Sequence, residues 1–273
     1  TRITNPTTQI LEERLAALEG GIAAVAVASG SSAVALAIQN VASAGDNIVT
    51  SPYLYGGTYN LFTNTLPKMG IEVRFADPSE PESFANQSDD RTRAYFGETL
   101  PNPQLIPFPI FDIAKIGRKR GIPLIVDNTA APITCRPFEH GAAVIVHSLT
   151  KFIGGHGTSI GGVIIDSGNF DWVENPDQQP NFNLPDGSYH GAVWGSLIPD
   201  ALGAPIAFAV RVRVVLLRDL GPSLSPFNAF QLIQGLETLP LRFERHQSNA
   251  EKLANYLSQH QTIVSVVYPK LFK

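Results

Sequence analysis

Residues 122–151 read IPLIVDNTAAPITCRPFEHGAAVIVHSLTK, and this segment gives the clearest indication of the fold. It holds two short apolar runs: the first leads into Asp127 and the second leads, a few residues further on, into Lys151. Runs rich in Val and Ile are typical of strands buried inside a parallel sheet. Because the carboxyl ends of adjacent parallel strands meet at one edge, we expect the Asp127 carboxylate and the Lys151 amine to face each other there.

On either side of this stretch, strand and helix patterns alternate. Strand patterns lie at 23–30, 45–51, 71–77, 92–99 and 161–166, and helical patterns lie at 6–19, 31–45, 57–69 and 111–121. This alternation predicts an α/β fold with a mainly parallel sheet flanked by helices. Polar residues follow most of the strands, at 29–31, 51–55, 98–102, 127–128 and 147–151. Since ligands bind at the carboxyl ends of such strands, these residues are the candidates for a site.

The second half of the chain has fewer strand patterns. Residues 170–205 are rich in Asn, Asp, Pro and Gly, which predicts a long surface loop with a short helix near 191–198, placed where it could cover an active site. Helical patterns resume at 204–220 and at 227–260, the second with a bend expected near Pro240. We expect a last strand at 262–269.

Composition and charge exclude several classes of function. The 273 residues include 20 Lys and Arg against 24 Asp and Glu, with no basic block, so neither a nucleic-acid nor a membrane-surface partner is predicted. The apolar runs are too short or too interrupted to span a bilayer. The single cysteine, Cys135, favours a reducing cytoplasm. No compact metal motif is formed by Cys135 with His140, His147 and His156, so we expect core or supporting histidines and no metal.

The candidate residues at the sheet edge suit pyridoxal 5'-phosphate (PLP). Its aldehyde forms a Schiff base with a lysine amine, for which Lys151 is the candidate. Its pyridine nitrogen requires a carboxylate that keeps it protonated, for which Asp127 is the candidate. Its phosphate requires hydroxyl groups and the N–H groups of a helix start, which the sequence offers at Gly30, Ser31, Ser148 and Thr150.

Beyond this chemistry, the chain resembles the cystathionine γ-synthase-like family of PLP enzymes in cysteine and methionine metabolism. The motifs that carry the resemblance are, in order, TRITNPT (1–7), SG (29–30), YGGTY (55–59), ETLPNP (98–103), VDNT (126–129) and SLTKFIGGHG (148–157). Segments such as RITNPTTQILEERLAALEGG and SPFNAFQLIQGLETL are most similar in sequence to the O-acetylhomoserine sulfhydrylases of that family. The resemblance implies the fold-type I architecture of PLP-dependent transferases.

The resemblance also implies a role for each matched residue. Lys151 would carry the Schiff base and act as the catalytic base, and Asp127 would contact the pyridine nitrogen. Gly30, Ser31, Ser148 and Thr150 would hold the phosphate.

Three further residues are matched in the same way. Tyr55 would stack on the ring. Tyr53 and Tyr59 are its competitors if the family motif aligns with this sequence in another register. Asn102 would hydrogen-bond the phenolic oxygen, and its alternative role is turn chemistry between two prolines. Arg2 would reach the phosphate of a neighbouring subunit.

The implied reaction is γ-replacement, in which O-acetyl-L-homoserine and sulfide or methanethiol give homocysteine or methionine and acetate. A methionine or homocysteine γ-lyase and a cystathionine γ-synthase are the alternatives within the family. An inactive truncated fragment that still oligomerises is an alternative of another class. A dinucleotide-binding module ranks below these, because no G-x-G-x-x-G follows the first strand.

The resemblance divides the chain into two parts. Residues 1–220 would form the large PLP-binding domain. Residues 221–273 would form a long linking helix and the start of an incomplete C-terminal domain, most of which we expect to be missing. A homodimer that pairs into a homotetramer, located in the cytoplasm, is implied for the assembly.

Overall fold

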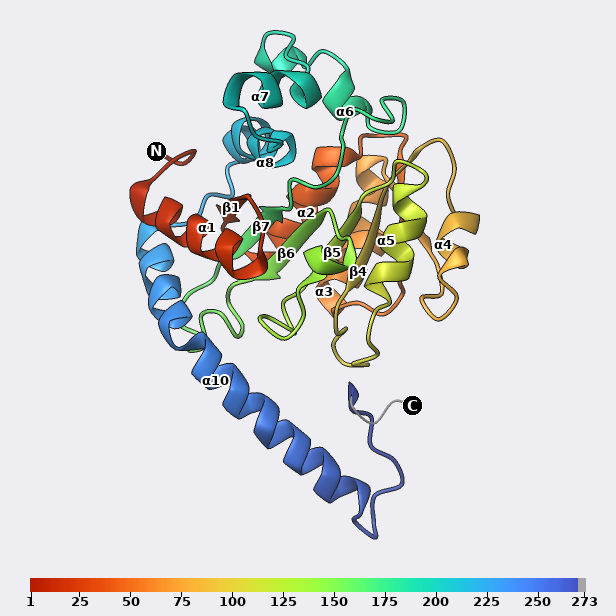
Figure 1. Ribbon diagram of the computed structural model, residues 1–273, viewed down its shortest axis with the longest axis vertical. Coiled ribbons are helices and arrows are strands. Elements are labelled where there is room, and N and C mark those ends of the chain that lie inside the picture. Colours follow the sequence, from red (N-terminus) through yellow and green to blue (C-terminus); the bar gives the residue numbers. More distant parts are fainter. Residues whose placement is uncertain (270–273) are drawn as a thin grey trace.

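The computed structural model describes residues 1–269 and contains a seven-stranded sheet with helices packed around it (Figure 1). The strand order is β1-β7-β6-β5-β4-β2-β3. These strands are β1 (Ala23–Val27), β2 (Asn47–Thr50), β3 (Glu72–Phe75), β4 (Thr92–Glu98), β5 (Leu124–Asp127), β6 (Val144–Ser148) and β7 (Gly162–Asp166). β7 runs antiparallel to β1 and β6, and the pairings among β2 to β6 are parallel. The predicted mainly parallel sheet is therefore confirmed.

Helices connect and cover these strands. They are α1 (Pro6–Glu19), α2 (Gly30–Val41), α3 (Gly56–Asn60), α4 (Glu82–Asn86), α5 (Ile110–Arg118), α6 (Pro180–Asn183), α7 (Trp194–Leu202), α8 (Ala207–Arg211), α9 (Arg218–Leu220) and α10 (Pro226–Ser258). α3 continues into a π-helical turn at Leu61–Thr65, and another at Val212–Leu217 joins α8 to α9. The helical patterns predicted at 57–69 and 204–220 are thus confirmed as helical, although neither is a regular α-helix throughout.

α1 begins and ends at the signals present in the sequence. The Asn5 side chain accepts hydrogen bonds from the backbone N–H groups of Thr7 and Thr8 and so satisfies donors of the first turn. Gly20 ends the helix with φ at 77°, a left-handed conformation that costs glycine little. α1 therefore stops where its last residue, Glu19, reaches the ends of β5 and β6.

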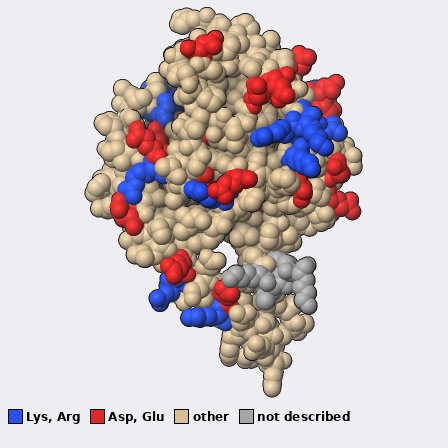
Figure 2. Space-filling model, viewed as in Figure 1, with Lys and Arg blue, Asp and Glu red and all other residues tan. Residues whose placement is uncertain are grey.

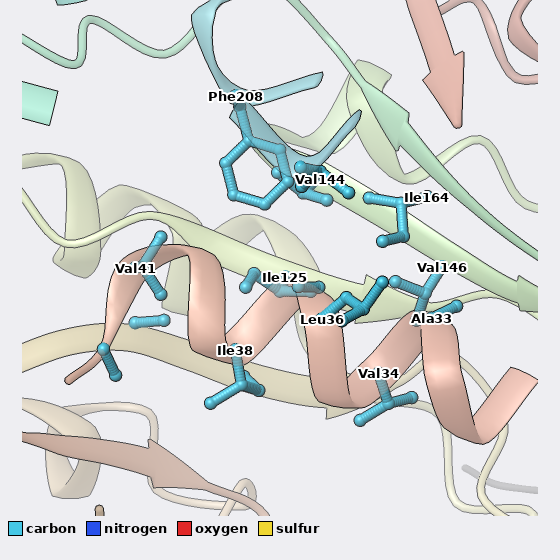
Figure 3. Close-up of a cluster of buried hydrophobic side chains, with 14 of the residues drawn as sticks. Ala33, Val34, Leu36, Ile38, Val41, Ile125, Val144, Val146, Ile164 and Phe208 are labelled. Carbon is cyan, nitrogen blue, oxygen red and sulfur yellow. The ribbon is translucent and has the colours of Figure 1, made fainter. Parts of the chain in front are cut away.

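An apolar face of α2 fixes this helix over the sheet. Figure 3 shows Ala33, Leu36 and other α2 side chains against Val144 of β6 and Ile164 of β7, and each of these residues is at most 2% exposed. Burying one such Val or Leu side chain stabilises a fold by about 1.5–3 kcal/mol. This packing holds the N-terminus of α2 beside the carboxyl end of β6.

The register of β5 and β6 confirms that the two strands end at the same edge of the sheet, as the sequence analysis expected. The two strands are adjacent and parallel, and Asp127 at the end of β5 pairs with Val146 of β6. Lys151 follows β6 in the turn that leaves the same edge.

Residues 170–205 do not form the predicted loop over an active site. Trp172 and Phe182 are buried and stack with their ring centroids 4.4 Å apart. The Gln179 side chain donates to the backbone oxygens of Arg93 and Gly121, at 3.1 and 3.0 Å, near the amino ends of β4 and β5. The segment thus packs at the edge of the sheet opposite to Lys151, because its aromatic side chains gain more from burial than its polar residues lose. The short helix expected near 191–198 is confirmed as α7.

The C-terminal part of the chain confirms one prediction and corrects another. The long helix predicted at 227–260 is α10, which contains Pro240 and runs out from the body (Figure 1). The strand predicted at 262–269 is wrong: these residues form no strand, and Val264 is fully exposed. An apolar β-branched run becomes a strand only when a neighbouring strand completes its hydrogen bonds, and none of the described strands lies beside it.

On the face shown in Figure 2, basic and acidic side chains are interspersed, and one compact cluster of Lys and Arg at the upper right is bordered by Asp and Glu. Within residues 1–269 no helix is long and apolar enough to cross a membrane.

Candidate functional site

A cavity of about 670 Å³ opens at the carboxyl edge of the sheet. It is lined by all of the predicted site residues except Arg2: Gly30, Ser31, Tyr55, Asn102, Asp127, Ser148, Thr150 and Lys151. These residues come from the ends of strands and from the loops that follow them, so the parallel topology gathers them from distant parts of the sequence.

The N-terminus of α2 forms one end of the cavity. The Ser29 hydroxyl caps the helix by accepting the Ser32 N–H at 3.1 Å. A Cβ atom at Gly30 would lie 2.5 Å from the Cβ of Ser148, so only glycine allows this close approach to β6. The Thr150 hydroxyl exchanges hydrogen bonds with the backbone of Gly161 and is held at the cavity wall. Free N–H groups at a helix start beside two hydroxyls are a donor set that fits a phosphate.

Lys151 is exposed to the cavity and starts a tight turn. The Gly155 N–H donates to the Lys151 carbonyl at 2.7 Å. Arg242 of α10 donates to the carbonyl oxygens of Phe152 and Ile153 at 2.8 and 3.2 Å. α10 thus fixes the turn that carries the lysine, and Arg242 itself lines the cavity.

Asp127 lines the same cavity and is half-buried. Its carboxylate accepts the Thr129 N–H at 2.9 Å, and the Thr129 hydroxyl in turn accepts the Ser148 N–H at 2.8 Å. Burial raises the pKa of Asp127, although the hydrogen bonds from Thr129 oppose the rise. A cation bound next to a buried carboxylate stabilises its charged form, and a protonated pyridine nitrogen is such a cation.

Tyr55 and Asn102 lie on the walls of the same cavity. Tyr55 is 48% exposed and precedes α3, which leaves its ring free to contact a ligand. Its two competitors, Tyr53 and Tyr59, do not line the cavity, and the Tyr59 ring packs on Phe75 with the ring centroids 5.5 Å apart. The structure therefore favours Tyr55 as the stacking residue, and this role stays a prediction.

Arg2 lies outside the cavity of its own chain. Its guanidinium donates to the Arg218 carbonyl oxygen at 3.0 Å. The predicted contact with the phosphate of a second subunit stays a prediction.

Glu98 also belongs to the site. The sequence analysis assigned no role to it, although it is the first residue of the ETLPNP motif. It ends β4, pairs with Asp127 across the sheet and lines the cavity. Burial, and secondly the charge of Asp127, raise the pKa of Glu98 to about 8. Two carboxyl groups thus share the cavity, and the raised pKa of Glu98 favours its protonated form.

A buried polar network supports the strand ends from behind. His147 Nε2 lies 2.7 Å from Glu19 Oε1, and the Asn128 amide donates to the same carboxylate at 3.1 Å. The Thr99 hydroxyl donates to the Asn128 side-chain oxygen at 2.8 Å. Thr99, Asn128 and His147 each neighbour a cavity residue in the sequence, so the network holds the ends of β4, β5 and β6 together. The prediction of a core or supporting histidine is confirmed for His147.

Comparisons with known proteins agree with this geometry. A family model described as "Cys/Met metabolism PLP-dependent enzyme" matches residues 1–273. O-acetyl-L-homoserine sulfhydrylase of Leptospira meyeri is 54% identical over 99% of this chain and 62% of its own length. Homocysteine/cysteine synthase of Saccharomyces cerevisiae is 50% identical over 99% of this chain and 60% of its own length. The chain thus spans about 60% of the length of these curated relatives.

Solved structures show the same likeness. A putative O-acetylhomoserine (thiol)-lyase from Campylobacter jejuni, with N'-pyridoxyl-lysine-5'-monophosphate in its chain, superposes with a TM-score of 0.93 at 45% identity, over 99% of this chain and 66% of that one. O-acetylhomoserine sulfhydrylase of Wolinella succinogenes gives a TM-score of 0.81 at 38% identity, over 94% of this chain and 70% of that one.

Proposed function

Because this chain belongs to the family of PLP-dependent enzymes of cysteine and methionine metabolism, we propose that it catalyses γ-replacement on O-acetyl-L-homoserine. Sulfide would replace acetate to give homocysteine, and methanethiol in its place would give methionine. The names of the relatives support the sulfhydrylase reaction over the γ-lyase and γ-synthase alternatives.

The observation that carries the proposal is the cavity that gathers an amine, a carboxylate and a phosphate-type donor set at one sheet edge. Its volume of about 670 Å³ lies in the range of cofactor sites. Lys151 and Asp127 face it from neighbouring elements, and the close approach at Gly30 opens the start of α2 toward it. The residues present thus fit PLP.

The proposed roles follow from these positions. When bound, PLP supplies an electron-withdrawing ring that stabilises negative charge on the substrate carbon. Lys151 would hold the cofactor through its Nζ atom and, once the substrate amine has replaced it, accept a proton from the substrate. Asp127 would keep the pyridine nitrogen protonated, and Tyr55 would cover a face of the ring.

The remaining cavity residues would bind and orient. Asn102 would hold the phenolic oxygen of the ring. Gly30, Ser31, Ser148 and Thr150 would hold the phosphate through hydroxyl and N–H groups at the positive end of the α2 dipole.

A direct assay tests the reaction. The purified chain, supplied with PLP, is incubated with O-acetyl-L-homoserine and sulfide, and separately with methionine alone. We expect sulfide-dependent homocysteine, lost in Lys151→Ala and kept in Lys115→Ala, which removes an exposed lysine of α5. α-Ketobutyrate from methionine without homocysteine would establish the γ-lyase instead. PLP binding without either product would establish the inactive fragment.

For the assembly, the proposal is a cytoplasmic homodimer that pairs into a homotetramer, with Arg2 reaching across the first interface. Exposed apolar side chains along α10 support an interface there; they include Phe227, Leu241 and Tyr256, each more than 60% exposed. The division into a PLP-binding domain at 1–220 and a linking part at 221–273 belongs to the same proposal. Light scattering on the purified chain tests the proposed oligomeric state, since a monomeric mass at micromolar concentration would contradict both the dimer and the tetramer.

A further inference from the structure

The Glu98 side chain lines the cavity and has no ion-pair partner among the residues that the structure describes. Its side chain belongs to a residue that is only 6% exposed, at the last position of β4. The cavity residues that carry titratable or charged groups beside it are Tyr55, Asp127, Lys151, Arg242 and His246. None of the ion pairs formed by the described residues includes Glu98.

What Glu98 does contact is the backbone of two cavity loops. Its Oε1 atom accepts the N–H of Tyr55 at 2.8 Å. The N–H of Asn102 also donates to the carboxyl group. One buried side chain therefore joins the loop after β2, which carries Tyr55, to the loop after β4, which carries Asn102.

We propose that Glu98 is a positioning residue, which sets the places of the two loop residues proposed to contact the cofactor ring, Tyr55 and Asn102. The inference rests on the proposed function, because it is the PLP ring that these two residues are proposed to contact. Without the carboxyl group, the two N–H groups lose their acceptor, and each loop is free to shift by itself. Both proposed ring contacts would then weaken together, although neither residue has been changed.

The protonation state of Glu98 determines which substitution can replace it. Because burial and the neighbouring Asp127 raise the pKa of Glu98 to about 8, the neutral carboxylic acid is the favoured form at pH 7. Its carbonyl oxygen can accept the N–H groups, and a glutamine amide has the same shape and the same carbonyl oxygen. Glu98→Gln should therefore replace the natural residue, whereas Glu98→Ala should not.

The experiment titrates PLP into wild type, Glu98→Gln, Glu98→Ala and the control Glu80→Gln, which changes an exposed glutamate. The readouts are the visible absorbance of bound PLP, which gives Kd, and its visible circular dichroism, which reports how the ring is held. We expect Glu98→Gln and Glu80→Gln to stay within about twofold of the wild-type Kd, and Glu98→Ala to bind about tenfold or more weakly. The dichroic band should be reduced in Glu98→Ala alone, because a change of overall stability would not alter the band of the cofactor that remains bound.

Two outcomes would overturn the inference. One is a Glu98→Ala protein that binds PLP with the wild-type Kd and dichroic band. The other, which applies even if Glu98→Ala fails to fold, is a Glu98→Gln protein that folds but binds about tenfold more weakly than wild type. A wild-type chain that develops no visible band with PLP would instead refute the proposed function.

Discussion

Replacing Glu19 by Ala removes the acceptor at the centre of the buried network behind the cavity. Glu19 is 2% exposed, and its carboxylate receives the Asn128 amide and faces His147 Nε2 at 2.7 Å. Within residues 1–269 the other ring nitrogen, His147 Nδ1, is buried without a partner. A lone pair left unpaired there costs less than an unpaired N–H, so we place the ring N–H on Nε2, where it donates to Glu19.

The size of the effect follows from this network. The substitution leaves the His147 Nε2–H without an acceptor, whereas the Asn128 amide keeps its bond to the Cys135 carbonyl and loses its second one. Each buried donor left unpaired costs about 1–3 kcal/mol, and the space vacated by the side chain adds to this. We therefore expect a loss of about 3–5 kcal/mol in the free energy of unfolding.

Urea denaturation followed by circular dichroism measures this loss directly. The matched control is Glu13→Ala, which removes an exposed glutamate of α1 and should change the free energy of unfolding by less than about 0.5 kcal/mol. A Glu19→Ala protein within about 1 kcal/mol of wild type would refute the reasoning, because it would mean that the buried donors lose little when their acceptor is removed.

Three further changes test other parts of the structure. Gly30→Ala places a Cβ atom 2.5 Å from that of Ser148, so it should force α2 off β6 and weaken PLP binding by about tenfold or more in a visible-absorbance titration. Arg242→Ala frees the carbonyl groups of the turn after Lys151 and should raise the protease sensitivity of that turn at little cost to the sheet. Burial raises the pKa of Asp166 to about 6. Folding therefore favours its protonated form, so Asp166 makes stability fall as pH rises from about 4 to about 6, by up to about 1.4 kcal/mol per pH unit, and the slope should be shallower in Asp166→Asn than in wild type.

Each of these predictions has a contradicting result. Unchanged PLP affinity in Gly30→Ala would mean that α2 does not need its close approach to β6. Equal cleavage of wild type and Arg242→Ala would show that α10 does not hold the lysine turn. A parallel pH dependence of unfolding in wild type and Asp166→Asn would assign the slope to other groups.

The sequence predicted most of the sheet because its strands are signalled locally. Short Val- and Ile-rich runs, each followed by polar residues, are sufficient to place β5 and β6 side by side and to direct Asp127 and Lys151 to one edge. The cap at Asn5 and the end of α1 at Gly20 are equally local features, which depend on single residues next to the helix.

What the sequence did not predict depends on contacts between distant residues. The role of Glu98 rests on a bond to the backbone of Tyr55, which no local pattern indicates. Trp172 and Phe182 pack against each other although the residues around them are polar, so composition predicted a loop where the structure has a buried cluster. The run at 262–269 has the composition of a strand, but strand formation requires a neighbour that the described chain does not provide.

The central claim is that Lys151 is the residue that holds PLP in this cavity. Incubating the chain with PLP, reducing it with borohydride and mapping the digested peptides by mass spectrometry tests this claim directly. We predict the pyridoxyl phosphate mass on the peptide that contains Lys151, and no stoichiometric label in Lys151→Ala. A stoichiometric label on another lysine, or no label on the wild-type chain, would contradict the account.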